Sequence, residues 1–173
     1  MSSESTSPTP VDIRKAERRS LHFDSLAEAL ADVRTLAAGP VRATGNRTPS
    51  DLVHHLAQAV EVYVAGIDPK TIPLPLRVIG KVARPLVRHM MLDRPMSPGF
   101  KMPKRMQETF YGEDDGDLDG AIARYAAAID TLEAAQTLPR HPVLGDLPPE
   151  QARWLHCRHA ELHLSFLHPQ APA

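Results

Sequence analysis

Apolar residues recur every three or four positions in much of this chain, and this period is typical of helices with one buried face. The fourth segment shows it most clearly, with Ile122, Tyr125, Ile129 and Leu132 at helical spacing. No segment has a convincing strand pattern. The sequence therefore predicts an all-α fold with helical segments over residues 26–38, 49–65, 76–92, 117–135 and 149–167.

Polar residues, glycines and prolines mark the ends of these helices. Ser25 and Glu28 form a capping-box pattern before the first helix. Thr48 is a favourable N-cap for the second helix, and Gly66 is a natural stop. Pro85 should kink or divide the third segment, because proline breaks a helix interior. The boundaries therefore support the helices that the periodicity predicts.

A long connection over residues 93–116 separates the third segment from the fourth. A loop of this length in a compact domain often forms a lid or the wall of a pocket, although a passive surface crossover is an equal alternative. Four main helices with apolar faces are most simply packed as a bundle. We therefore expect a four-helix bundle with one long crossover and an extra short helical segment.

The chain of 173 residues is long enough for one domain with a hydrophobic core. Residues 1–20 begin with a polar Ser/Thr/Pro-rich stretch, and residues 169–173 are a Pro/Ala tail. Such compositions are typical of chain ends outside the core. We therefore expect a flexible N-terminal arm over 1–20, a single domain over 21–168 and a disordered tail over 169–173.

Composition limits the classes of partner. The net charge of −1 and the low aromatic content of 5% give no support for nucleic-acid binding. The chain has no secretory signal pattern and no stretch long enough to span a membrane. Cys157 is the only cysteine, which excludes an internal disulfide and fits a reducing cytoplasm. We therefore expect a cytoplasmic protein without nucleic-acid or membrane partners, with a small-molecule substrate if the chain is an enzyme.

Histidines provide the most specific chemical signal. His159 and His163 are four residues apart in the last helix and should share one face, which borders its apolar side. His156 lies on the same border. In the second helix, the ~100° step per residue places His55 beside the apolar stripe and turns His54 away from it. Periodicity thus selects His55, His159 and His163 as three imidazoles that could converge on one divalent ion.

Three histidine ligands would leave at least one coordination position open, which is typical of catalytic rather than structural sites. Nitrogen ligands do not discriminate strongly between Zn²⁺, Ni²⁺ and Fe²⁺. The alternative is that these are hydrogen-bonded core or boundary histidines, since a chain with 9 histidines contains such spacings by chance. A His-Glu-x-x-His metalloprotease is excluded because Ala160 stands where the glutamate is needed. Cys157 points away from the ligand face.

The chain resembles the DinB-like (YfiT-like) superfamily of putative metal-dependent proteins, and within it an uncharacterised bacterial branch. The resemblance covers about residues 21–166. It rests on the order and spacing of several short pieces of sequence, namely Thr48-Pro49-Ser50-Asp51-Leu52-Val53-His54-His55-Leu56-Ala57, Pro98-Gly99-Phe100-Lys101, His141-Pro142-Val143-Leu144-Gly145, and Trp154 through His159-x-x-x-His163-Leu164.

The resemblance implies a four-helix bundle with a long crossover. It also implies a metal held by His55, His159 and His163, and a hydrolase or a thiol-dependent transferase that uses a low-molecular-weight thiol. Related bundles often pair, so a homodimer is compatible with it. This chain departs from the family pattern at Leu162 and Ser165, which would make the pocket more apolar and weakens any transfer of a specific substrate.

Further candidate roles follow from position. His156 could line the pocket or act as an acid or base, unless it is only a boundary hydrogen-bonder. Lys101, in the long loop, could bind an anionic substrate, although most lysines are simply solvated. Asp51 could orient a ligand, but its place at a helix N-terminus is a simpler explanation. The rival to a metalloenzyme is a non-catalytic helical protein, for ligand binding or dimerisation, with a structural metal or none.

Overall fold

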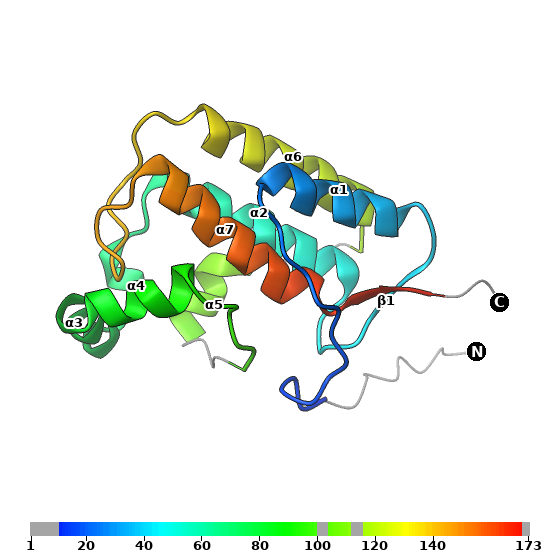
Figure 1. Cartoon of the computed structure of the whole chain (residues 1–173), viewed down its shortest axis with the longest axis horizontal. Coiled ribbons are helices and arrows are strands. Elements are labelled where there is room, and N and C mark those ends of the chain that lie inside the picture. The colour runs from blue at the N-terminus through cyan, green and yellow to red at the C-terminus, as the bar shows by residue number, and fades with distance from the viewer. Residues whose placement is uncertain (1–10, 100–103, 112–115, 171–173) are drawn as a thin grey trace.

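The computed structural model describes residues 11–99, 104–111 and 116–170 (Figure 1). Within these ranges the chain is mostly helical, which confirms the all-α class. The elements are α1 Leu26–Ala37, β1 Val41–Ala43, α2 Pro49–Ala65, a 3₁₀ turn Pro69–Thr71, α3 Leu74–Val82, α4 Arg84–Leu92, α5 Lys104–Phe110, α6 Leu118–Ala134, α7 Pro149–Leu164 and β2 Leu167–Pro169.

The predicted helix boundaries are confirmed by hydrogen bonds at the caps. The Ser25 hydroxyl accepts a hydrogen bond from the Glu28 backbone N–H at 3.3 Å, at the start of α1. At the start of α2, the Thr48 hydroxyl accepts a hydrogen bond from the Asp51 backbone N–H at 3.1 Å. Gly66 ends α2 with a φ of 95°, a conformation that other residues rarely adopt. Local chemistry therefore fixes where α1 and α2 begin and where α2 ends.

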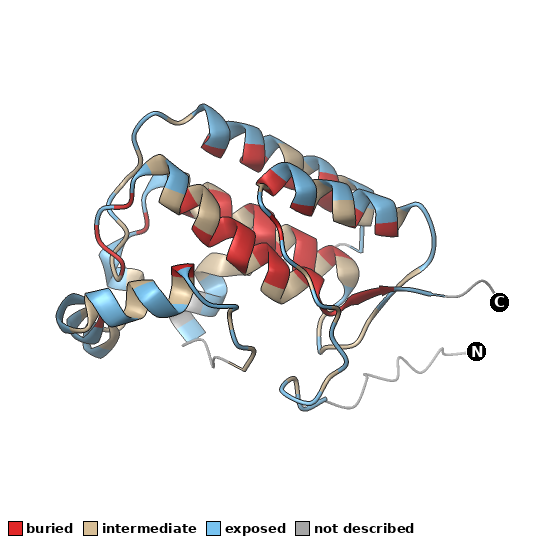
Figure 2. Cartoon of the chain, in the orientation of Figure 1, coloured by how far each residue is buried: buried red, intermediate tan, exposed pale blue. Residues whose placement is uncertain are grey.

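Four helices, α1, α2, α6 and α7, lie side by side and form one side of the molecule (Figure 1). Their buried faces turn toward one another, while their outer faces are exposed (Figure 2). The interior between them is almost entirely apolar, as burial of hydrocarbon surface requires. Fully buried members of this core include Leu26, Val33, Leu56, Tyr125, Leu132 and Leu164.

The third predicted segment divides close to Pro85, as expected. It forms α3 and α4 with a break at Ala83, so that Pro85 falls in the first turn of α4, where no backbone N–H is needed. A second apolar cluster joins these helices to α2 and α7 through Tyr63, Leu92 and Leu155. Trp154 of α7 adds a hydrogen bond from its indole N–H to the Leu92 carbonyl at 2.6 Å.

The sequence predicted no strands, and this prediction is wrong, because the structure contains two short ones. Strands β1 and β2 pair antiparallel, with Arg42 opposite His168. Strands of three residues are too short to show alternation, so the sequence gives no signal for them. The expected disordered tail is likewise corrected at its start, because Pro169 belongs to β2 and the Gln170 N–H donates to the Pro40 carbonyl at 2.8 Å.

The expected flexible arm over residues 1–20 also needs correction, for residues 11–20. Arg19 binds both carboxylate oxygens of Asp32, at 2.8 and 2.6 Å, and its backbone N–H donates to the Ser165 carbonyl at 2.8 Å. Ile13 and Ala16 pack against the apolar core. Polar composition hid these contacts, because they depend on partners in other elements, Asp32 in α1 and Ser165 at the end of α7.

The long connection over 93–116 contains a helix, α5, that the sequence did not predict. Of the residues that the structure describes, no helix is both long and apolar enough to cross a membrane.

Candidate metal centre

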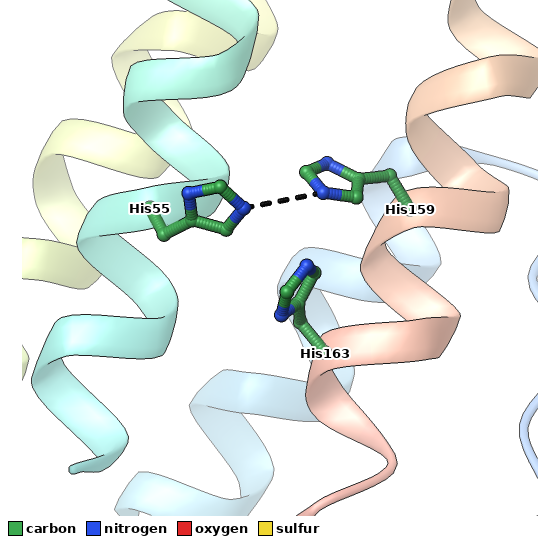
Figure 3. Close-up of side chains that lie close together, drawn as sticks. All are labelled: His55, His159 and His163. Carbon is green, nitrogen blue, oxygen red and sulfur yellow. Dashed lines mark hydrogen bonds between the residues drawn. The ribbon is translucent and has the colours of Figure 1, made fainter. Parts of the chain in front are cut away.

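Three histidine side chains meet between α2 and α7 (Figure 3). His55 comes from the middle of α2, and His159 and His163 come from successive turns of α7. The Nε2 atoms of His55 and His159 are 3.2 Å apart, and one ring nitrogen of each residue lies within 4.8 Å of the others. The structure thus brings together the three residues that helical periodicity selected.

The spacing fits a divalent ion. Two nitrogens at the usual 2.0–2.1 Å from a tetrahedral Zn²⁺ are about 3.3 Å from each other. The separation between His55 and His159 is close to that value. His55 is buried, whereas His159 and His163 are half-buried because they border a cavity. The three imidazoles are therefore suitable ligands for a divalent ion, and the spacing of His55 and His159 is close to the spacing that such an ion requires.

A backbone carbonyl determines which nitrogen of His55 carries the proton. The Nδ1 atom of His55 is 2.7 Å from the Phe110 carbonyl oxygen. That oxygen can only accept, so Nδ1–H must donate, and the lone pair of neutral His55 is left on Nε2, facing His159. Metal-binding histidines are commonly held in this way, by a hydrogen bond from the other ring nitrogen.

The segment just after α5 forms a wall of the site. The Tyr111 ring stacks on His55, with centroids 4.0 Å apart and an angle of 11° between the planes. The Arg47 guanidinium lies 3.5 Å from the centroid of Tyr111 and binds the Asp51 carboxylate at 2.6 Å. Asp51 is thus connected to His55 by a series of contacts through Arg47 and Tyr111. The long connection is a pocket wall here, one of the two roles expected for it.

Sequence reasoning missed Arg47, Phe110 and Tyr111. Phe110 acts through its backbone carbonyl, which no side-chain pattern reveals. Tyr111 lies in a connection without periodicity, so only the folded chain shows that it reaches His55. Arg47 had a weak signal, since it is four residues before Asp51 and such pairs attract each other across one helical turn.

Burial keeps the three histidines neutral at pH 7. The pKa of His55 is lowered to about 4, mainly by desolvation; the hydrogen bond to Phe110 opposes this shift, and the nearby Arg47 adds to it. Desolvation and the neighbouring imidazoles hold the pKa values of His159 and His163 well below the usual range. Neutral imidazole is the form that binds metals, so the site needs little proton release to accept an ion.

His156, the candidate acid or base, lies beside the three histidines rather than among them. Its ring is 5.6 Å from that of Tyr63, and both residues line the same cavity. Within the described part of the chain, neither His156 Nε2 nor the buried Tyr63 hydroxyl has a hydrogen-bond partner. Two buried polar atoms are thus available to a molecule in the cavity. Lys101, the other candidate, lies outside the described residues.

The cavity has a volume of about 1630 Å³. The three histidines, His156 and Tyr63 line one part of it, and side chains of α3 and α4 line another. Small-molecule sites usually have volumes of about 300–1,000 Å³, so there is ample room for a substrate next to the histidines.

Other histidines have local hydrogen-bonding roles. His89 pairs with Asp93 at 2.8 Å, and His168 is part of β2. His141 accepts hydrogen bonds at Nδ1 from the Val143 and Leu144 N–H groups, at 3.1 and 3.0 Å, and so stabilises the turn before α7. These contacts give them structural or surface roles.

His141 also makes stability depend on pH. Burial lowers its pKa to about 4, below the value of about 6.5 in an unfolded chain. The unfolded state therefore binds the proton first, and the contribution to stability is full above pH 6.5 and is lost as the pH falls toward 4. His141→Asn keeps an acceptor for the two N–H groups but cannot be protonated. Between pH 7 and pH 5, we expect the free energy of unfolding of this variant to fall by about 2 kcal/mol less than that of the parent protein.

Urea unfolding in the presence of a chelator measures this difference. Equal acid sensitivity of His141→Asn and the parent would contradict this role of His141.

Comparison with known proteins places the chain in a family. Residues 15–170 match a family described as a protein of unknown function, DUF1569. This range includes every element from α1 to β2, and with them all three clustered histidines. No curated protein and no solved structure matches the chain. Since the match covers nearly the whole sequence, the chain belongs to the DUF1569 family of proteins of unknown function.

Proposed function

We propose that this protein is a metal-dependent enzyme of the DinB-like type, in which His55, His159 and His163 hold one divalent ion. In this proposal α1, α2, α6 and α7 are the four-helix bundle of that superfamily, and the segment from α3 to α5 is its long crossover. The observation that carries the proposal is the meeting of three neutral imidazoles, from two helices about 100 residues apart in the sequence, at the wall of a large cavity.

The donor set favours Zn²⁺, Ni²⁺ or Fe²⁺, for which imidazole is a suitable ligand. Among the described residues, the cluster has three members. Cys157 is buried in the apolar core on another side of α7 and does not belong to it. A position on the ion would therefore remain for a molecule from the cavity, as in catalytic sites.

The bound ion would supply Lewis acidity, which makes water or a low-molecular-weight thiol a better nucleophile near pH 7. The chain itself does the positioning. Phe110 fixes the tautomer of His55, and Tyr111 fixes the plane of its ring. His156 is uncharged near pH 7, because burial lowers its pKa to about 4, so its free nitrogen can accept a proton or a hydrogen bond from a reacting group. Hydrolysis and thiol transfer are the two reactions that suit this arrangement.

The rival is a non-catalytic helical protein with a structural metal or none. A structural zinc usually has four protein ligands and no open position. The three-membered cluster and the cavity beside it favour the enzyme. A small-molecule substrate is therefore the partner that we propose for the site.

Cobalt spectroscopy tests for the open position. Co²⁺ is added to the metal-free protein, followed by the thiol 2-mercaptoethanol, and sulfur-to-cobalt charge-transfer absorption is recorded in the near ultraviolet. We expect this band in the parent protein and in His54→Ala, which changes a neighbouring histidine of α2 outside the cluster. His163→Ala should show no band. A cobalt spectrum that does not respond to the thiol would favour a closed, structural site.

A further inference from the structure

Exposed apolar side chains are concentrated on α3 and α4. Of the large hydrophobic residues of the described chain that are exposed, only Val11 lies elsewhere. Contiguous apolar surface of this kind usually marks a binding site rather than an ordinary solvated face. The residues concerned are Leu74, Val78, Ile79, Val82, Leu86 and Met90.

These residues fall into two groups. Ile79, Leu86 and Met90 are 55, 60 and 56% exposed, and all three line the cavity that contains the histidines. Leu74, Val78 and Val82 are 66, 52 and 80% exposed and do not line it. The first group thus forms an apolar mouth to the cavity, and the second group lies on the outside of α3.

The apolar wall continues inward from this mouth. Ile72, Leu76, Val87 and Met91 line the same cavity, between the mouth and Tyr63. Methionines at positions 90 and 91 add flexible, polarisable surface that adapts to ligand shape. Apolar surface therefore lines one part of a cavity whose other part holds the three histidines.

Positive charge lies near the histidine end. The cavity as a whole is lined by Arg14, Arg47 and Arg94 and by one carboxylate, that of Asp12. Of these arginines, Arg47 is the one whose contacts place it at the histidine end, where it also pairs with Asp51. Arg47 lies over Tyr111, which in turn stacks on His55. No carboxylate belongs to the histidine cluster, as far as the structure describes the chain. An anionic group is therefore better suited than a cationic one to this end of the cavity.

We propose that the cavity binds a long-chain aliphatic anion, with its tail against α3 and α4 and its charged head at the three histidines. The position of the head rests on the proposed function. The tail needs only apolar contacts and does not depend on a metal. A volume of about 1630 Å³ accommodates such a chain with room for a second, smaller reactant.

Displacement of a fluorescent fatty acid tests this proposal. Dansyl-undecanoate is bound to the protein and displaced by hexanoate, octanoate, decanoate and dodecanoate. Each further buried methylene is expected to strengthen binding about threefold to fourfold. Dodecanoate should therefore displace the probe at a concentration at least 100 times lower than hexanoate. Equal potency along the series would overturn the proposal.

Variants distinguish the cavity from the outer surface of α3. We expect Ile79→Asn and Leu86→Asn to weaken dodecanoate binding at least tenfold. Leu74→Asn and Val82→Asn are matched controls, because they change equally exposed apolar residues that do not line the cavity, and they should bind as the parent does. Circular dichroism checks that each variant is folded. If the controls lose binding to the same extent, dodecanoate binds the outer apolar surface of α3 rather than the cavity, and the proposal is wrong.

Metal uptake separates this proposal from the proposed function. His163→Ala should bind little zinc but should retain dodecanoate binding within about tenfold, since the tail contacts are unchanged. Chain-length dependence in a protein that takes up no zinc would support the apolar site and contradict the metalloenzyme. Normal zinc uptake without chain-length dependence would support the metal site and contradict the apolar site.

Discussion

His163→Ala is expected to lower the affinity for Zn²⁺ by roughly 100- to 1000-fold. Sites with four protein ligands bind zinc with about 10–16 kcal/mol, so each ligand contributes on the order of 3 kcal/mol. His163 is one of three donors, and no fourth histidine belongs to the cluster among the described residues. His55→Ala and His159→Ala should show losses of similar size. Competition with a chromophoric chelator measures the affinity.

His54→Ala is the control for this experiment. It removes an imidazole from the same helix and leaves the cluster intact. Its zinc affinity should match that of the parent protein. Similar losses in His54→Ala and His163→Ala would show that zinc binds at scattered surface histidines, and the three-histidine site would be refuted.

The second large effect concerns stability. Glu161→Ala is expected to reduce the free energy of unfolding by about 3–5 kcal/mol, because it leaves a buried cation without its partner. Arg158 and Glu161 form an ion pair on α7, with side chains only 6 and 7% exposed. Both also bind the backbone of Phe23, whose N–H donates to Glu161 at 2.7 Å and whose carbonyl accepts from Arg158 at 2.9 Å. The pair thus attaches the segment before α1 to α7.

Chemical denaturation measures this loss, and two further variants test its cause. The double variant Arg158→Met, Glu161→Met removes both charges and should be much less destabilised than Glu161→Ala, since no buried charge is left unpaired. Glu17→Ala removes an exposed ion pair with Arg42 and should leave the unfolding transition unchanged. If Glu161→Ala unfolds like Glu17→Ala, the pair does not hold this segment in place.

The parts of the fold that follow from local chemistry could be predicted from the sequence. Thr48 and Gly66 mark the ends of α2, because capping and a positive φ depend on the residues at those positions. The choice of His55 over His54 also came from local information, since a helix with one apolar face fixes which neighbour points inward. In the structure His55 is buried and faces His159 and His163.

The parts that depend on distant contacts could not be predicted in this way. The three-residue strands β1 and β2 are held by pairing across more than 120 residues. Tyr111 and the Phe110 carbonyl reach His55 only because α5 packs on α2. Periodicity also could not show that residues 22–23 cover Glu161 and make it part of a buried ion pair.

X-ray absorption at the zinc edge directly tests whether three histidines hold the ion, because it counts the imidazoles around it. The protein is loaded with one equivalent of Zn²⁺, and the scattering is fitted for histidine ligands. We expect three histidine nitrogens at about 2.0–2.1 Å from the zinc ion and at least one further ligand that is not an imidazole. A protein that takes up no zinc, or an ion without histidine scattering, would contradict it.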